Sequence, residues 1–218
     1  MDANRKTAYY ALMDVETKSS YSNLALNHQI ILGKPSSPSF VRGLVYGVLE
    51  NKILLDHIIE HFITSDIDKL KTSDLVILRM GIYQLGYMNS VPEYAAVNES
   101  VVLAKKFCKG REGFINGVLR SYIRNRHAVP MPDRSEDQIK YLSIKYSCLE
   151  WIVEMWIDQY GVETTEQILK YSQGNPGLCI RVNTLKTGKE DLMRRLTEKG
   201  FEVKESQICD SALLVTKG

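Results

Sequence analysis

The 218-residue sequence lacks the features that mark membrane proteins and secreted, disulfide-rich proteins. Its longest apolar stretches, such as residues 152–157, are interrupted by acidic residues within a few positions, whereas a bilayer-spanning helix needs about 20 apolar residues. The N-terminal residues have no apolar core of the kind found in signal peptides. The four cysteines stand far apart without a CxxC pair, which suits a reducing compartment. We therefore expect a cytoplasmic protein with no membrane partner.

Glycine-rich loops that bind phosphate are absent as well. None of the 14 glycines lies two positions from another and no GK[ST] occurs, so neither a dinucleotide fingerprint nor a P-loop is supported. His57, Glu60 and His61 match the inverted zinc-protease pattern. A catalytic zinc needs a third protein ligand, and none is evident, so a solvated helix edge is favoured. We expect no catalytic residue, no cofactor site and no metal site in this chain.

The sequence does contain enough apolar residues for a packed core, since 44% are hydrophobic. Within residues 1–127, apolar residues recur at helical spacing. Examples are Phe40, Leu44 and Val48, followed by Leu54, Ile58 and Phe62. Because the connections are short and no convincing period-2 stretch intervenes, this region predicts an all-helical bundle. The expected fold class is mainly α.

The expected domain boundary is the linker 128–134, which contains Pro130 and Pro132 and shows no periodicity. Residues 1–127 form the first expected domain. Residues 135–218 form the second, a small α+β domain.

The second domain combines helices with short strands. Capping-box spacing at residues 147–150 and 187–190 predicts two helix starts. Residues 175–177 predict a turn. Three strands are expected, at residues 178–184, 201–203 and 213–215. This β-α-β-β order is an incomplete split βαβ arrangement, one element short, so the domain looks truncated.

Positive charge is concentrated in one block. Residues 105–127 carry one acid, Glu112, and seven bases, which are Lys105, Lys106, Lys109, Arg111, Arg120, Arg124 and Arg126. Such clustering predicts a site for a polyanion, although the ends of solvated helices often carry charge runs. Arg5 and Lys6 extend the cationic surface if the two ends of the bundle meet.

Several motifs resemble the NusB family. They are Phe40–Asn51 (FVRGLVYGVLEN), Asp74–Leu85 (DLVILRMGIYQL), Val91–Ser100 (VPEYAAVNES) followed by Ala104–Phe107 (AKKF), and Phe114–Arg120 (FINGVLR). Their order and spacing agree with the family across most of residues 4–126. The resemblance implies an all-helical RNA-binding module.

The region after the linker resembles the second N-terminal domain of the RsmB (Sun, Fmu) family of bacterial 16S rRNA cytosine-5 methyltransferases. The motifs are Trp151–Trp156 (WIVEMW) and Leu178–Leu185 (LCIRVNTL). For the full-length protein the resemblance implies methyl transfer from S-adenosylmethionine, with a Cys thiolate that follows a Pro as nucleophile. No Pro precedes any Cys here. We therefore expect a non-catalytic portion that stops before the methyltransferase domain.

Candidate RNA contacts come from two sources. The NusB resemblance points to Arg5 and Lys6, whereas the charge pattern adds Lys105, Lys106, Lys109, Arg120 and Arg124. Arg181 and Asn183 lie two residues apart in an expected strand and would share a face. They could contact RNA or dock the catalytic domain, and a structural role for Asn183 is equally open.

Two main functions follow, with different partners. In the first, the chain holds 16S rRNA for a methyltransferase domain further along the same polypeptide. In the second, it acts as a NusB-like module of transcription antitermination that binds a ribosomal protein. A third reading, a stand-alone enzyme, predicts that these residues bind S-adenosylmethionine.

Overall fold

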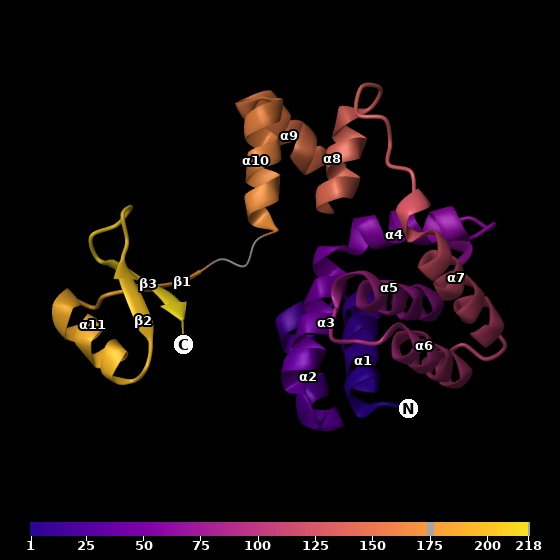
Figure 1. Cartoon of the computed structure of the whole chain (residues 1–218), viewed down its shortest axis with the longest axis horizontal. Helices are drawn as coiled ribbons and strands as arrows, with labels where there is room; N and C mark the ends of the chain where they lie inside the picture. Colours follow the sequence, from indigo (N-terminus) through magenta and orange to yellow (C-terminus); the bar gives the residue numbers. More distant parts are fainter. Residues whose placement is uncertain (174–176, 218) are drawn as a thin grey trace. The chain divides into compact units, whose positions relative to one another are not determined.

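The computed structural model describes residues 1–173 and 177–217 (Figure 1). Contacts divide the chain into two compact units, Met1–Tyr171 and Ser172–Gly218. These units are defined by contacts between residues. They do not test the domain boundary expected at residues 128–134, which stays a prediction. Asn175 and Pro176, in the expected turn, lie outside the described residues.

The first unit is helical. Its α-helices are α1 (Ala3–Lys18), α2 (Ser22–Gly33), α3 (Pro38–Glu50), α4 (Lys52–Phe62), α5 (Thr72–Tyr87), α6 (Glu93–Phe107), α7 (Glu112–Asn125), α8 (Gln138–Tyr146), α9 (Glu150–Tyr160) and α10 (Val162–Ser172), with short 3-10 turns at η1 (Ile67–Lys69) and η2 (Arg126–Ala128). Local chemistry sets several starts. Asp2 accepts the backbone N–H of Asn4 before α1, and Ser37 accepts that of Phe40 before α3.

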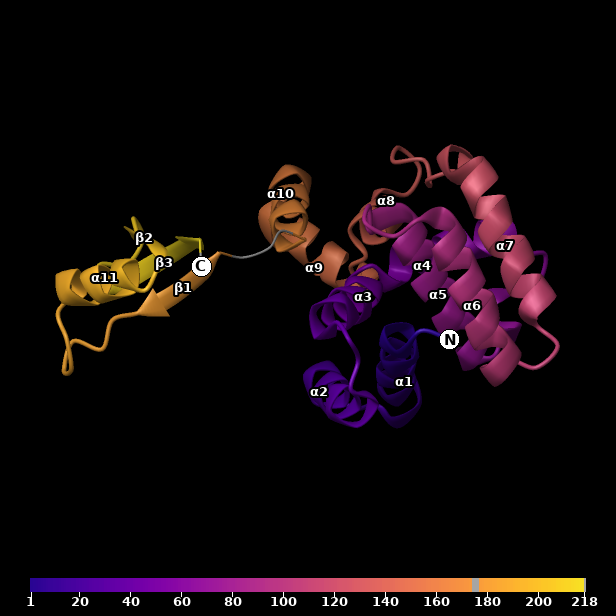
Figure 2. The ribbon, with the colours of Figure 1, turned by 60° about the horizontal axis from the view of Figure 1, so that its bottom comes forward.

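Helix α5 is the central helix of the bundle. It buries ten of its residues and packs against α1, α3, α4, α6 and α7; Figure 2 shows α5, α6 and α7 side by side. Gly47 of α3 allows a close approach, since a Cβ there would lie 1.9 Å from Cζ of Tyr83. The apolar spacing that predicts a bundle in residues 1–127 is confirmed by this core.

A buried ion network crosses the core. Arg79 of α5 donates from Nε and Nη2 to the two carboxylate oxygens of Asp56, at 2.6 and 2.8 Å. Its Nη1 lies 3.4 Å from Glu16 of α1, and the Arg79 side chain is only 6% exposed. Because a charge removed from water needs hydrogen-bonded partners, this network fixes α1, α4 and α5 to one another.

Helices α8, α9 and α10 form a small second core within the first unit, around Leu142, Val153 and Leu169. The capping box predicted at residues 147–150 is wrong. Ser147 follows the end of α8 in a left-handed conformation, and its hydroxyl accepts the N–H of Ile53 at the start of α4. Helix α9 does begin at Glu150, but its N-cap residue is Leu149, so Ser147 lies two residues too early to cap it.

The second unit is a three-stranded antiparallel sheet with one helix. The elements are β1 (Leu178–Arg181), α11 (Lys189–Glu198), β2 (Glu202–Glu205) and β3 (Ala212–Lys217), in the strand order β1-β3-β2. The mainly α fold class with a small α+β part is confirmed. The capping box at residues 187–190 is wrong, because Thr187 donates its hydroxyl to Asp191 rather than capping α11.

Strand β1 is shorter than the sequence predicts. It ends at Arg181, and the side chain of Asn183 accepts the N–H of Leu185 in the following turn. This Asx-type turn redirects the backbone. Arg181 and Asn183 therefore do not share one strand, and the hydrogen bond gives Asn183 a structural role.

Candidate nucleic-acid interface

Helix α1 meets the end of α6 through three aromatic rings. Tyr9 stacks on Phe107, with centroids 4.3 Å apart, and Tyr10 contacts the same ring edge-on at 5.4 Å. Two lysines flank the cluster: Lys6 Nζ lies 5.9 Å from the centroid of Tyr10, and Lys106 Nζ lies 5.6 Å from that of Phe107. Segments about a hundred residues apart in sequence thus form one mixed cationic and aromatic surface.

We name this surface the α1–α6 patch and define it as Lys6, Tyr10, Lys105, Lys106, Phe107 and Lys109. The lysines at 105, 106 and 109 are exposed at the C-terminal end of α6, where cations suit the helix dipole. In the described part of the chain, no carboxylate lies within ion-pair distance of any lysine of the patch. The patch therefore presents unneutralised positive charge.

Two titratable groups beneath the patch, Tyr9 and Cys108, are neutral at ordinary pH. Burial raises the pKa of Tyr9 to about 12, with smaller contributions from neighbouring groups. Burial also raises the pKa of the Cys108 thiol, to about 11. Because neither group ionises near neutrality, neither adds charge beneath the patch. The carboxylate of Asp74, which contributes to both shifts, is paired with Arg111.

Arg5 stands apart from the patch although it precedes Lys6. Its Nη1 pairs with Asp2 at 2.7 Å, its Nε donates to Gln84 at 2.6 Å, and its side chain is 12% exposed. The guanidinium also lies over the ring of Phe40. Arg5 therefore ties α1 to its neighbours and adds little free charge to the surface.

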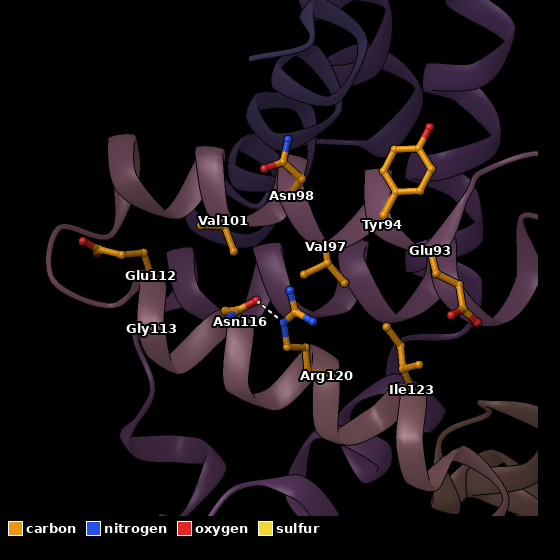
Figure 3. Close-up of a pocket in the computed structure, with 10 residues that line it drawn as sticks. All are labelled: Glu93, Tyr94, Val97, Asn98, Val101, Glu112, Gly113, Asn116, Arg120 and Ile123. Atoms are coloured by element: carbon orange, nitrogen blue, oxygen red, sulfur yellow. Dashed lines mark hydrogen bonds between the residues drawn. The ribbon is translucent and has the colours of Figure 1, made fainter.

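The basic block of residues 105–127 divides between the two ends of the α6–α7 pair. Arg120 of α7 lines a groove of about 690 Å³ between these helices. Its side chain donates a hydrogen bond to Asn116 and reaches towards Val97 of α6 (Figure 3). Arg124 lies one turn further along α7, where it donates to Ser121. The structure does not bring these arginines together with Lys105–Lys109, at the opposite end of α6.

The remaining bases of the block are neutralised. Arg111 pairs with the buried carboxylate of Asp74 at 3.1 Å and lies over the ring of Phe114. Arg126 pairs with Glu93 at the start of α6. These two arginines therefore hold the ends of α6 and α7 in place.

Arg181 belongs to the second unit. It is exposed on β1, opposite Ala212 of β3. No role for Arg181 follows from the arrangement of the sheet itself.

Tyr10 and Phe107 are residues of the patch that the charge pattern of the sequence does not single out. A signal was present, since Lys6 and Tyr10 are four residues apart on one helix and Lys106 directly precedes Phe107. Aromatic residues between lysines are typical of surfaces that bind single-stranded nucleic acid. The charge pattern alone does not reveal that the two pairs meet.

His57, the first residue of the zinc-protease-like pattern, makes a structural contact. Nε2 of His57 lies 2.8 Å from the carbonyl oxygen of Pro130 in the segment after η2. Among the described residues, no group of three His, Cys, Asp or Glu side chains is arranged to hold a metal ion. None of the described helices is long and apolar enough to cross a membrane.

Several cavities among the described residues lie between helices or beside the linker. The absence of a cofactor site from this chain stays a prediction.

Comparison with known protein families decides the assignment of the helical bundle. The model of the NusB family matches residues 2–124. The chain belongs to the NusB family. A second model, the ferredoxin-like domain of RsmF/B-like methyltransferases, matches residues 150–218. The resemblance drawn from the sequence is therefore confirmed.

Individual relatives agree with this pair of domains. The chain is 36% identical to a probable ribosomal RNA small subunit methyltransferase B of Bacillus subtilis, over 98% of the chain and 48% of that protein. It is 34% identical to the transcription antitermination protein NusB of Bacillus licheniformis, over 53% of the chain and 89% of that protein. The chain thus spans about half the length of the methyltransferase relative that it matches. That match also includes the region after the linker, which the match to the NusB relative does not cover.

A solved structure supports the fold. The crystal structure of the antitermination factors NusB and NusE in complex with double-stranded RNA superposes with a TM-score of 0.51, at 22% identity. The match covers 56% of this chain and 94% of that one. At this identity the likeness concerns the helical fold alone.

Proposed function

We propose that the chain is the RNA-binding N-terminal portion of an S-adenosylmethionine-dependent 16S rRNA cytosine-5 methyltransferase. In this proposal it positions rRNA in the cytoplasm for a catalytic domain in the same polypeptide. The order of its two family domains supports it. The single observation that carries the RNA-binding role is the α1–α6 patch. Its four lysines have no acidic partner among the described residues, and two of them, Lys6 and Lys106, lie over the rings of Tyr10 and Phe107.

Lysines at the patch would contact phosphates, which supply affinity but no sequence information. Recognition would come from unpaired bases in loops or junctions, because the deep major groove of an RNA helix does not admit side chains. Arg120 and Arg124 form a second, separate cationic position in this proposal. Arg5 contributes by fixing α1, and Arg181 keeps two open roles, RNA contact or docking of the catalytic domain.

Charge reversal at two places tests the proposal. Lys105→Glu with Lys109→Glu, measured by titration of a fluorescent rRNA-junction fragment, should weaken binding at least about tenfold, since each lost phosphate contact lowers affinity. Arg120→Glu with Arg124→Glu tests the second position. The matched control is Lys140→Glu with Lys170→Glu, since both lysines are exposed on α8 and α10. Equal losses in the patch variant and the control would contradict the proposed interface.

The cofactor and the ribosomal-protein partner can be tested with the same chain. Calorimetry with S-adenosylmethionine should give no signal, because the proposal places the cofactor in the catalytic domain. Capture of a ribosomal protein without any preference for rRNA would favour the NusB-like antitermination module instead.

A further inference from the structure

A pocket opens beside the α1–α6 patch, between α1 and α2, with a volume of about 390 Å³. Helix α1 contributes Lys6, Thr7 and Tyr10, and α2 contributes Gln29, Leu32 and Gly33. We propose that this pocket holds an unpaired nucleobase of single-stranded RNA. The inference rests on the proposed function, since it names the form of RNA that the first unit would bind.

The walls of the pocket suit a flat aromatic ligand. Tyr10 is 36% exposed, and Leu32, an aliphatic residue on the other helix, is 63% exposed. A base could therefore stack on an aromatic face and lie against an aliphatic one. Such stacking tolerates any base, because every base has a π-face. The pocket lies near the lower end of the about 300–1,000 Å³ typical of ligand sites, which suits one nucleotide.

The depth of the pocket depends on small residues. Thr7 is buried, and a Cβ at position 33 would lie 2.3 Å from its hydroxyl oxygen. Glycine at this position therefore lets α2 approach α1 closely. Leu32 is held beside Tyr10 by this contact between the helices.

Polar groups are placed for the edge of the base and for its phosphate. Nε2 of Gln29 donates to Asp14 at 2.6 Å, which fixes the amide. In the described part of the chain no hydrogen bond reaches the Gln29 carbonyl oxygen, so it can accept one from a base N–H. Lys6, at the rim, carries a charge that no described carboxylate neutralises, and it can contact the phosphate of the same nucleotide.

This chemistry selects single strands over duplexes. In a duplex both faces of each base are covered by its neighbours, so no base is free to stack on Tyr10. A duplex would still contact the lysines of the patch through its phosphates. The pocket therefore predicts a difference between the two forms of RNA that charge alone does not.

The experiment measures binding of a labelled, mixed-sequence 12-nucleotide RNA, alone and annealed to its complement, to the 218-residue chain. Tyr10→Ala should weaken binding of the single strand about 5- to 150-fold, the range for losing one stacked base, whereas Tyr10→Phe keeps the ring and should bind like the wild type. Leu32→Asp should weaken it at least about fivefold more than Ile31→Asp. Ile31 is the matched control, because it adjoins Leu32, is 72% exposed and does not line the pocket.

The outcomes separate the pocket from the proposed function. Equal single-strand affinities for Leu32→Asp and Ile31→Asp would overturn the pocket, while salt-dependent binding would leave the proposed function standing. Failure of the wild type to bind either RNA would overturn both. Circular dichroism reports whether each variant folds. If Tyr10→Ala does not fold, the comparison of Leu32→Asp with Ile31→Asp tests the pocket.

Discussion

The salt dependence of RNA binding follows from the number of free lysines in the α1–α6 patch. Four of them, Lys6, Lys105, Lys106 and Lys109, have no ion-pair partner in the described part of the chain. For a single strand, the logarithm of the binding constant falls with the logarithm of salt at about −0.7 per phosphate contact. Four contacts give a slope of about −2.8.

The corresponding change in affinity is large enough to measure. Between 50 and 200 mM salt, a slope of about −2.8 lowers the binding constant about 50-fold. Replacing the lysines at 105, 106 and 109 by glutamine leaves one contact, so the slope should fall to about −0.7 and the loss to about threefold. If Arg120 and Arg124 also contact phosphates, the slopes of the wild type and of the triple variant each become steeper by about 1.4.

Fluorescence anisotropy titrations at four salt concentrations provide the two slopes. Lys140→Gln with Lys170→Gln serves as control, since these lysines lie on α8 and α10 and should leave the slope unchanged. The reasoning fails if the wild type shows no salt dependence. It also fails if the triple variant keeps the wild-type slope, because the counterions would then be released elsewhere.

Three further predictions concern the stability of the scaffold. Arg79→Met should lower the free energy of unfolding in urea by about 1–3 kcal/mol. It leaves the partly buried Asp56 carboxylate without its partner, whereas Glu16 keeps its ion pair with Lys52. Gly47→Ala should destabilise by about 1–3 kcal/mol in the same assay, since the new methyl group overlaps the Tyr83 ring. A hydrogen bond from Lys145 lowers the pKa of the Glu166 carboxyl below its ordinary value of 4.5. The ionised carboxylate therefore stabilises the fold fully above pH 4.5, and this stabilisation is lost as pH falls through the lowered pKa. Glu166→Gln should therefore cost about 1 kcal/mol at pH 7 and progressively less as pH falls below 4.5, as measured by thermal unfolding.

Helical periodicity predicts the parts of the fold whose residues face the core. In α3, Leu44 and Val48 recur at helical spacing and are buried. Helix α2 gives a weaker signal, because Leu24, Ile31 and Leu32 face solvent and only Leu26 among its large apolar residues is fully buried. Periodicity reports burial rather than helicity, and this helix buries little of its apolar surface.

Both capping-box sequences predict a helix start correctly, since α9 begins at Glu150 and α11 at Lys189, but neither predicted side-chain cap forms. Ser147 and Thr187 have the right spacing to cap the helices that follow. Both hydroxyls instead bond to groups that spacing does not reveal, the N–H of Ile53 and the carboxylate of Asp191. A side chain that can cap a helix also serves other partners, and tertiary structure chooses among them.

The candidate site shows the same limit at the level of single residues. Arg5 and Lys6 are adjacent bases that the sequence does not distinguish. Neighbouring positions on a helix are separated by about 100° around its axis, so Arg5 meets Asp2 and Gln84 whereas Lys6 lies over Tyr10. Which base remains free depends on the surface beneath it.

The same principle explains why the basic block is divided. Phe107 ends α6 and packs on Tyr9, and Arg111 anchors the next turn through its ion pair with Asp74. Between Phe107 and Arg111 the chain has no acidic residue. Lys109 therefore stays exposed and unpaired on a segment that is held at both ends. Arg111, which looks equivalent to Lys109 in the sequence, is neutralised by this ion pair and holds the segment in place. A variant that breaks the anchor, Arg111→Met, should therefore weaken RNA binding without removing a phosphate contact, lowering affinity at every salt concentration while leaving the slope unchanged.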